Sequence, residues 1–240
     1  MPVYSPPLDD IKFMLRDVLN AEQLTAFEGY EDFSLDMIDQ ILEEGGKVCE
    51  EVFFPLNQIG DEEGCTFKDG EVTTPKGFKE AYDTFVEGGW TGLACDPEYG
   101  GMGMPQLVNT AMKEMICSSN MSLGMYPGLS YGAYEALYKF ATDELKNIYL
   151  PKIVDGTWSG TMCLTEPHCG TDLGLIKSKA VPDESGGYSI AGTKIFISAG
   201  EHDMTENIIH LVLAKLPDAP EGARGISLFV VPKFIPNDAG

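Results

Sequence analysis

A change of hydrophobic period near Asp155 constrains the fold of this chain more than any other feature. Before it, apolar residues such as Leu8, Ile11 and Leu15 recur every three or four positions, the period of an amphipathic helix. After it, short β-rich runs alternate with glycine turns, as at residues 184–187. The sequence therefore predicts an α+β fold, with an all-helical domain over residues 1–155 and an antiparallel β-barrel-like domain over residues 156–240.

Capping residues indicate where the helices of the first half begin. Helix starts are expected at Ser34, Thr74-Pro75, Pro105 and Thr142. Serine and threonine side chains accept hydrogen bonds from the first free backbone N–H groups of a helix, and proline suits its first turn. The stretch around Pro127 is interpreted as a break between helices.

The second half is expected to form strands without helices between them, which disfavours a parallel doubly wound sheet. Strands are predicted over residues 157–165, 188–190, 194–198, 208–214 and 225–231. The chain ends shortly after a strongly apolar run, so we expect the β-domain to be incomplete.

Charge and composition exclude several classes of partner. The chain has 38 acidic and 16 basic residues, a formal charge of −22, which would repel both phosphate backbones and anionic lipid surfaces. It has no apolar run of the ~18 residues that span a bilayer, and no secretory signal at its start. Its six cysteines are scattered. We therefore expect a cytoplasmic protein with reduced thiols that binds neither nucleic acid nor membrane.

Three short motifs lack the context that their chemistry needs. Residues 128–132 match the G-x-S-x-G nucleophile elbow, but no β-branched strand precedes them, so they are interpreted as a glycine-rich helix entry. Residues 101–103 lack the third glycine of a dinucleotide fingerprint and are interpreted as a tight loop between helices. His168 and Cys169 are adjacent, without a second ligand pair at useful spacing, so no metal site is predicted.

Two segments carry more specific chemistry. In residues 162–172, a β-run ends at Leu164 and Pro167 prevents it from continuing as a paired central strand. Gly170 then permits close backbone approach, and Thr171 supplies a hydroxyl. Backbone groups and hydroxyls at such a strand end suit the edge of a planar heterocycle and a phosphate ester. Such a turn alone is usually structural. A second segment, residues 192–200, Gly-Thr-Lys-Ile-Phe-Ile-Ser-Ala-Gly, favours a functional interpretation of the turn.

Together these two segments resemble the acyl-CoA dehydrogenase family of flavoproteins. They match, in order and spacing, the family's T-E-P-x-x-G-S-D turn and its G-x-K-x-W-I-T/S-N-G segment. Residues 89–93, 97–101 and 149–153 match as well, and residues 4–15 look like the N-terminal extension of a large-subunit branch that includes enzymes acting on 3-methylthiopropionyl-CoA. The resemblance implies a third, C-terminal helical domain, which we expect to lie outside this chain.

The resemblance implies FAD-dependent α,β-dehydrogenation of an acyl-CoA thioester in fatty acid metabolism, in a homo-oligomer that passes electrons to an electron-transfer flavoprotein. It places FAD-binding roles on Met162, Leu164, Thr165, Gly170, Thr171, Phe196 and Ser198. Thr165 would donate to the flavin pyrimidine oxygen, and Thr171 would also lie near the CoA arm of the substrate. The catalytic glutamate base is expected beyond residue 240, so no catalytic residue is assigned and we expect the chain alone to lack turnover.

The sequence departs from the family pattern at three positions. Phe196 replaces tryptophan, which keeps ring stacking but loses an N–H donor; Thr171 replaces serine and keeps the hydroxyl; Ala199 replaces asparagine. Two alternatives stay open. The parent protein could be an acyl-CoA oxidase, which oxygen would re-oxidise, or a flavin-free, non-catalytic helical interaction module on the same scaffold.

Overall fold

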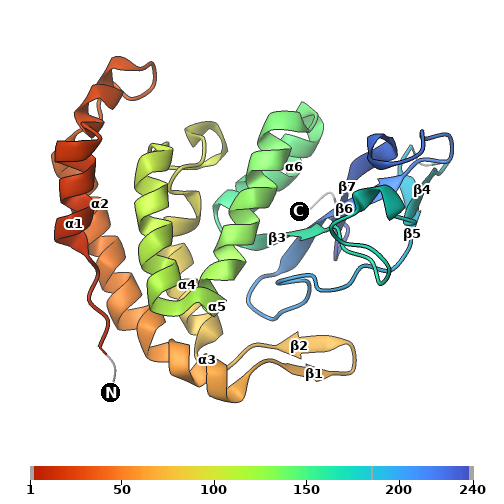
Figure 1. The fold of residues 1–240 in the computed structure, drawn as a ribbon, viewed down its shortest axis with the longest axis horizontal. Coiled ribbons are helices and arrows are strands. Elements are labelled where there is room, and N and C mark those ends of the chain that lie inside the picture. The colour runs from red at the N-terminus through yellow and green to blue at the C-terminus, as the bar shows by residue number, and fades with distance from the viewer. Residues whose placement is uncertain (1–2, 185, 238–240) are drawn as a thin grey trace.

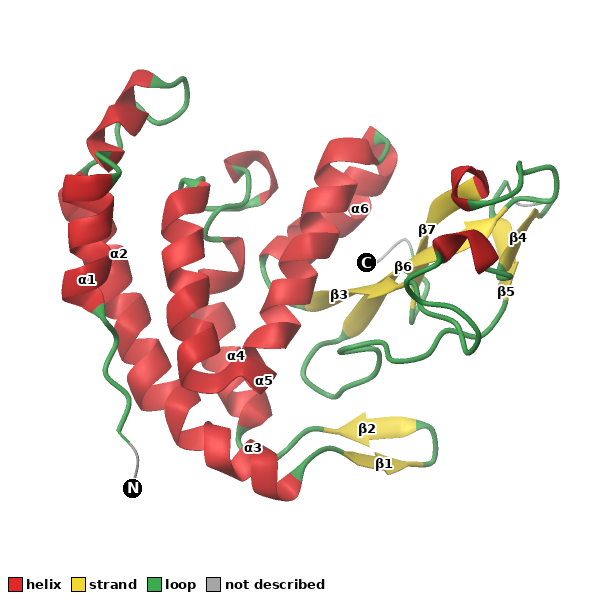
Figure 2. Ribbon diagram, in the orientation of Figure 1, coloured by secondary structure: helices red, strands yellow, loops and turns green. Residues whose placement is uncertain are grey.

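In the computed structural model, which describes residues 3–184 and 186–237, a group of helices leads into a sheet (Figures 1 and 2). The helices are α1 (Leu8–Phe13), α2 (Leu35–Lys47), α3 (Asn57–Glu63), α4 (Phe78–Glu87), α5 (Gln106–Phe140) and α6 (Asp143–Val154). The strands are β1 (Thr66–Lys68), β2 (Glu71–Thr73), β3 (Trp158–Cys163), β4 (Lys179–Pro182), β5 (Tyr188–Ala191), β6 (Asn207–Lys215) and β7 (Ile226–Pro232). π-Helical turns extend α1 and α2, at Met14–Val18 and Val48–Phe53.

Two of the expected helix caps are confirmed. The Ser34 side chain accepts from the backbone N–H of Met37 at 3.2 Å, at the start of α2. Thr142 accepts from the backbone N–H of Leu145 at 3.4 Å, at the start of α6. Each side chain satisfies one of the N–H groups that the first turn leaves without an intrahelical partner.

The expected cap at Thr74 is wrong. Helix α4 begins three residues after Pro75, and Gly77, with φ of 87°, occupies the cap position. The backbone N–H and the hydroxyl of Thr74 instead both donate to Asp203 Oδ1, at 3.1 and 2.7 Å. This contact ties the helical half to a loop of the second half, a long-range use of threonine that local sequence does not indicate. Pro105 likewise lies just before α5 rather than in its first turn.

The long helix α5 breaks at Asn120 and not at Pro127, which lies inside it. Asn120 has non-helical backbone angles (φ −156°, ψ 89°), and its Oδ1 accepts from the backbone N–H of Leu123 at 3.1 Å. The break separates a first arm, residues 106–119, from a second arm, residues 121–140. Residues 128–132 lie within the second arm, so helix rather than strand precedes Ser130 and the nucleophile elbow is excluded.

A small hairpin inside the helical half was not expected from the sequence. Strands β1 and β2 pair antiparallel around Asp69-Gly70. Both turn residues have positive φ, 53° and 93°, as a two-residue type I′ hairpin requires. The Asp-Gly pair was the available signal, although the strands are only three residues each.

The main sheet is open and mixed, so the expectation of an antiparallel barrel-like domain is wrong in strand direction and in closure for the described residues. Strand β6 pairs parallel with β3 and antiparallel with β7, while β4 pairs antiparallel with β5. The 43-residue stretch between β3 and β6, residues 164–206, is long enough to return the chain in the same direction.

The predicted strand over residues 194–198 is also wrong, because residues 192–197 belong to no strand and residues 198–199 form a turn. A β-rich sequence becomes a strand only where a neighbouring strand is available to complete a ladder. Conversely, β4 was not expected, and it forms because β5 lies beside it.

The second arm of α5 and helix α6 pack against β3 (Figure 1). Gly160 on β3 makes this contact close: a Cβ built there would lie 2.3 Å from the Cβ of Ala133. The backbone N–H of Gly160 donates to Ser130 Oγ at 3.1 Å. Between residues 3 and 237, leaving out the undescribed residue 185, the structure contains no helix with the length and apolar character needed to traverse a bilayer.

Candidate functional site

The two segments singled out by the sequence lie side by side just beyond the end of β3. The backbone N–H of Ile195 donates to the carbonyl oxygen of Thr165 at 2.9 Å. The Lys194 ammonium donates to the carbonyl oxygen of Leu164 at 3.1 Å. Residues 192–200 therefore run along the turn that follows the strand, and the fold brings together two segments that are some thirty positions apart.

Glu166 is the centre of this junction. Its side chain is 3% exposed and accepts from the Ser178 hydroxyl at 2.6 Å, the Lys177 backbone N–H at 2.8 Å and the Lys194 ammonium at 2.9 Å. Burial by itself would raise the pKa of this carboxyl. The hydrogen bonds, which favour the charged form, outweigh burial and lower the pKa to about 2. Glu166 is therefore a carboxylate that fixes the turn, and its oxygens are already engaged.

The predicted site residues differ in exposure. Leu164, Thr165 and Gly170 are half-buried, whereas Met162, Thr171, Phe196 and Ser198 are exposed. A Cβ built on Gly170 would lie 3.3 Å from Thr165 Cγ2, so the backbone there passes close to the threonine. The structure thus brings Leu164, Thr165 and Gly170 together and joins them to the second segment through Lys194 and Ile195. No contact recorded for the described residues joins Phe196 or Ser198 to them.

Three hydroxyls at this site are free to bind a ligand. In residues 3–184 and 186–237, the side chains of Thr165, Thr171 and Ser198 make no hydrogen bond to another residue. Strand β3, which ends two residues before Thr165, is at the edge of the sheet and pairs only with β6 among the described strands.

The backbone at Phe196 is unusual. Phe196 and Ala199 have φ of 55° and 54°, in the left-handed region that bulky residues rarely adopt. The Phe196 side chain is 89% exposed, so its own packing does not hold this conformation. Such outliers cluster at ligand-binding segments, where bound groups complete the surroundings.

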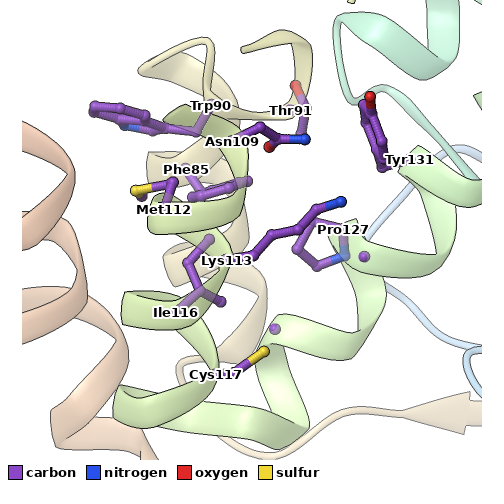
Figure 3. Close-up of a pocket in the computed structure, with 12 residues that line it drawn as sticks. Phe85, Trp90, Thr91, Asn109, Met112, Lys113, Ile116, Cys117, Pro127 and Tyr131 are labelled. Carbon is purple, nitrogen blue, oxygen red and sulfur yellow. The ribbon is translucent and has the colours of Figure 1, made fainter. Parts of the chain in front are cut away.

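A cavity of about 250 Å³ lies between the two arms of α5 (Figure 3). Its wall is mostly apolar, with Trp90 and Met112 on one side and Pro127 on the second arm. Lys113 extends from the first arm toward Pro127 and Tyr131, as Figure 3 shows. The cavity volume is slightly below the ~300–1,000 Å³ typical of small-molecule pockets, so the cavity suits a small or short ligand group.

His168 and Cys169 have a third neighbour that the sequence argument did not anticipate. Their ligand atoms and those of Glu166 lie within 4.8 Å of one another. The His168 Nε2 is 3.5 Å from Glu166 Oε2 and is bonded to the carbonyl of Leu175 at 2.9 Å. Because the hydrogen bonds described above already occupy the Glu166 oxygens, this cluster is explained as part of the turn.

Sequence reasoning assigned no role to Glu166, Lys194 or Lys113. Glu166 lies in the segment of residues 162–172 and Lys194 in the segment of residues 192–200. The opposite charges of these two residues were the available signal for an ion pair between the segments.

Lys113 lies on a helix face that also carries the polar side chains of Gln106 and Asn109, and nothing local distinguishes it from a solvated lysine. Its partner across the cavity, Tyr131, depends on the break at Asn120.

The chain is thus a helical unit packed on a sheet whose edge strand ends in a turn with free hydroxyls. The family model for the N-terminal domain of acyl-CoA dehydrogenases matches residues 47–157, and the model for the middle domain of the same enzymes matches residues 161–239. This chain therefore belongs to the acyl-CoA dehydrogenase family.

Individual relatives agree with this assignment. The 3-methylmercaptopropionyl-CoA dehydrogenase of Ruegeria pomeroyi is 48% identical over 237 residues, 99% of this chain, and the chain spans 40% of that relative's length. The solved structure of an electron transferring flavoprotein of Acidaminococcus fermentans matches with a TM-score of 0.68 at 26% identity, over 83% of this chain and 48% of that one. An acyl-CoA dehydrogenase of Bacillus anthracis, solved with FAD, has a TM-score of 0.65 at 23% identity, over 85% of this chain and 32% of that one, which shows a shared fold.

Proposed function

We propose that this chain forms the helical and middle portions, divided near residue 155, of a FAD-dependent acyl-CoA dehydrogenase. The reaction is α,β-dehydrogenation of an acyl-CoA thioester, and a substrate similar to 3-methylthiopropionyl-CoA is favoured by the name of the Ruegeria relative. The observation that carries the proposal is the Lys194-mediated junction of two segments, which brings residues 192–200 beside Leu164 and the free hydroxyl of Thr165 at the end of β3.

The residues present fit a flavin. An isoalloxazine ring is planar, with an apolar face and an edge of hydrogen-bonding atoms. Met162, 40% exposed, and Phe196, 89% exposed, offer apolar surface, and Thr165 offers a hydroxyl without a protein partner. FAD, when bound, would accept the β-hydrogen of the substrate as a hydride, which is chemistry that protein side chains do not supply.

Each site residue has a proposed part. Met162 and Leu164 contact the ring, and Thr165 donates to its pyrimidine oxygen, where preorganised donors stabilise developing negative charge. Gly170 lets the backbone approach the phosphates, since a side chain there would crowd Thr165. The remaining roles are binding of phosphate and CoA by Thr171, and contact with the ring face and its N5 side by Phe196 and Ser198.

We also propose an electron-transfer flavoprotein as the electron acceptor and a homo-oligomeric enzyme. The match to the Acidaminococcus structure, at 26% identity, supports a flavin-dependent electron-transfer setting. None of the glutamates of this chain is proposed as the base that removes the α-proton. Glu166 in particular is excluded, because its carboxylate oxygens are engaged and its low pKa makes it a weak base.

An anaerobic spectrum tests this function. The whole enzyme that contains this chain is loaded with FAD and mixed with 3-methylmercaptopropionyl-CoA, and with butyryl-CoA for comparison, while the flavin absorption band is followed. Loss of the band on mixing supports the dehydrogenase. Rapid return of the band in air-saturated buffer would identify an oxidase instead, and failure to retain any FAD would favour the flavin-free interaction module.

A further inference from the structure

Lys113 is a charged residue in a mostly apolar cavity. It lies on the first arm of α5, and its Nζ is 3.9 Å from the centroid of the Tyr131 ring on the second arm (Figure 3). The ring face attracts the ammonium but does not neutralise it. Over residues 3–184 and 186–237, Lys113 makes no ion pair or hydrogen bond with a side chain or backbone group.

Glu135 is the acidic residue whose charge acts most strongly on Lys113, and it already has other partners. It accepts from the Tyr131 hydroxyl at 2.8 Å and forms an ion pair with Lys139. Burial lowers the pKa of Lys113, and the charge of Glu135 only partly offsets this. An ammonium in such surroundings gains more from a hydrogen-bond acceptor inside the cavity than an exposed lysine would, because less water screens the contact.

The second arm of α5 lines the cavity and packs on strand β3, which leads into the candidate flavin site. Tyr131, on the cavity wall, follows Ser130, whose hydroxyl oxygen accepts from the backbone N–H of Gly160 on β3 at 3.1 Å. Gly160 lies two positions before Met162, the first of the proposed ring contacts. A thioester held at the end of β3 can thus direct its acyl chain toward this cavity, whose volume suits a short chain.

We propose that Lys113 determines substrate specificity, by selecting short acyl chains that carry a hydrogen-bond acceptor near their end, a thioether sulfur weakly and a carboxylate most strongly, over purely apolar chains of the same length. An apolar chain end reaching Lys113 would displace water from the ammonium without replacing its hydrogen bonds. A terminal carboxylate forms a charge-assisted hydrogen bond in a poorly hydrated place. This inference rests on the proposed acyl-CoA function.

Adipoyl-CoA and hexanoyl-CoA, equal in chain length and different in the terminal carboxylate, test the proposal. Their dissociation constants are measured by titration calorimetry, and kcat/KM by flavin reduction, with the FAD-loaded whole enzyme that contains this chain. We expect wild type to prefer adipoyl-CoA by about 10- to 100-fold. Lys113→Met should remove or reverse this preference, and Lys113→Arg should retain most of it. Lys146→Met is the matched control, because Lys146 faces the Tyr138 ring at 5.9 Å and does not line the cavity.

The outcomes separate the two proposals. If neither thioester binds or reduces the flavin, the proposed function fails, and the specificity inference fails with it. If both thioesters act but wild type prefers hexanoyl-CoA or shows no preference, the function stands and the inference about Lys113 is overturned. The same holds if the preference for adipoyl-CoA survives Lys113→Met or is lost equally in Lys146→Met.

Discussion

The Lys194 ammonium lies 2.9 Å from Glu166 Oε1, an ion pair in which both side chains are buried, at 10% and 3% exposed. Lys194 also reaches the carbonyl oxygen of Leu164 at 3.1 Å. One side chain therefore connects the segment of residues 192–200 to both the backbone and the carboxylate of the turn after β3. The geometry of the candidate flavin site depends on this pair.

Lys194→Met is expected to destabilise the protein by about 3–5 kcal/mol, because it leaves the buried Glu166 carboxylate without its cation. Urea denaturation measures the change. Lys233→Met is the matched control: it breaks the Lys233–Glu201 pair, whose side chains are 29% and 27% exposed, and should cost no more than about 1 kcal/mol. Equal losses in the two variants would contradict a special role for Lys194.

Glu166 should also make stability depend on acid pH. Its pKa falls from the ordinary value of 4.5 to about 2 on folding, so the unfolded chain takes up its proton first as the pH is lowered. The stabilisation is fully present above pH 4.5 and is lost as the pH falls through 2, amounting to ~3 kcal/mol. The unfolding free energy, measured in urea at each pH, should fall less steeply with decreasing pH in Glu166→Gln than in wild type. Parallel pH profiles for the two proteins would contradict a lowered pKa of Glu166.

His202 should act in a higher pH window. Its Nδ1 accepts from the backbone N–H of Met204 at 3.2 Å, so its Nε2 carries the hydrogen and donates to Ser159 Oγ at 3.0 Å. Burial of the neutral ring lowers the pKa from 6.5 to about 4. Stability should therefore be complete above pH 6.5 and fall by ~3 kcal/mol toward pH 4. The difference between wild type and His202→Gln in unfolding free energy, followed from pH 8 to 4, isolates this group from His210; a difference that stays constant would show that His202 does not titrate this way.

Two glycine substitutions test the packing of α5 on β3. Gly160→Ala places a Cβ 2.3 Å from that of Ala133 and should destabilise by about 1–3 kcal/mol. Gly132→Ala lies on the second arm of α5, and no atom is within 4 Å of the new Cβ, so this substitution should stabilise the protein by about 0.5–1 kcal/mol. Thermal unfolding of both variants checks the opposite signs, and two changes of the same sign would argue against the close contact.

How far the sequence predicts this molecule depends on how local each determinant is. The caps at Ser34 and Thr142 follow from contacts within one helical turn, and β3 and β6 from runs of β-rich sequence, so all four were predictable. Residues 194–198 have the composition of a strand, but their structure depends on which neighbours the fold supplies.

The same distinction applies to the candidate site. Its residues could be proposed from the two segments, because the order and spacing of motifs survive in sequence. The long-range contacts could not be predicted: Lys194 with Glu166, at the candidate site, spans 28 positions, and Thr74 with Asp203, between the two halves of the chain, spans 129. The cavity at Lys113 depends on the helix break at Asn120. The sequence had indicated a break seven positions further on, at Pro127. The roles of all seven proposed site residues, Met162, Leu164, Thr165, Gly170, Thr171, Phe196 and Ser198, stay predictions.

The most direct test of the account is a titration of FAD against wild type and Thr165→Val, with Thr193→Val as a control in the adjoining segment. The Thr165 hydroxyl has no partner among the described residues, so its removal should leave the urea midpoint unchanged. We predict that wild type binds FAD and that Thr165→Val weakens binding by about 3- to 10-fold while Thr193→Val does not. Failure of wild type to bind FAD, or equal affinity in Thr165→Val, would contradict a flavin site at the end of β3.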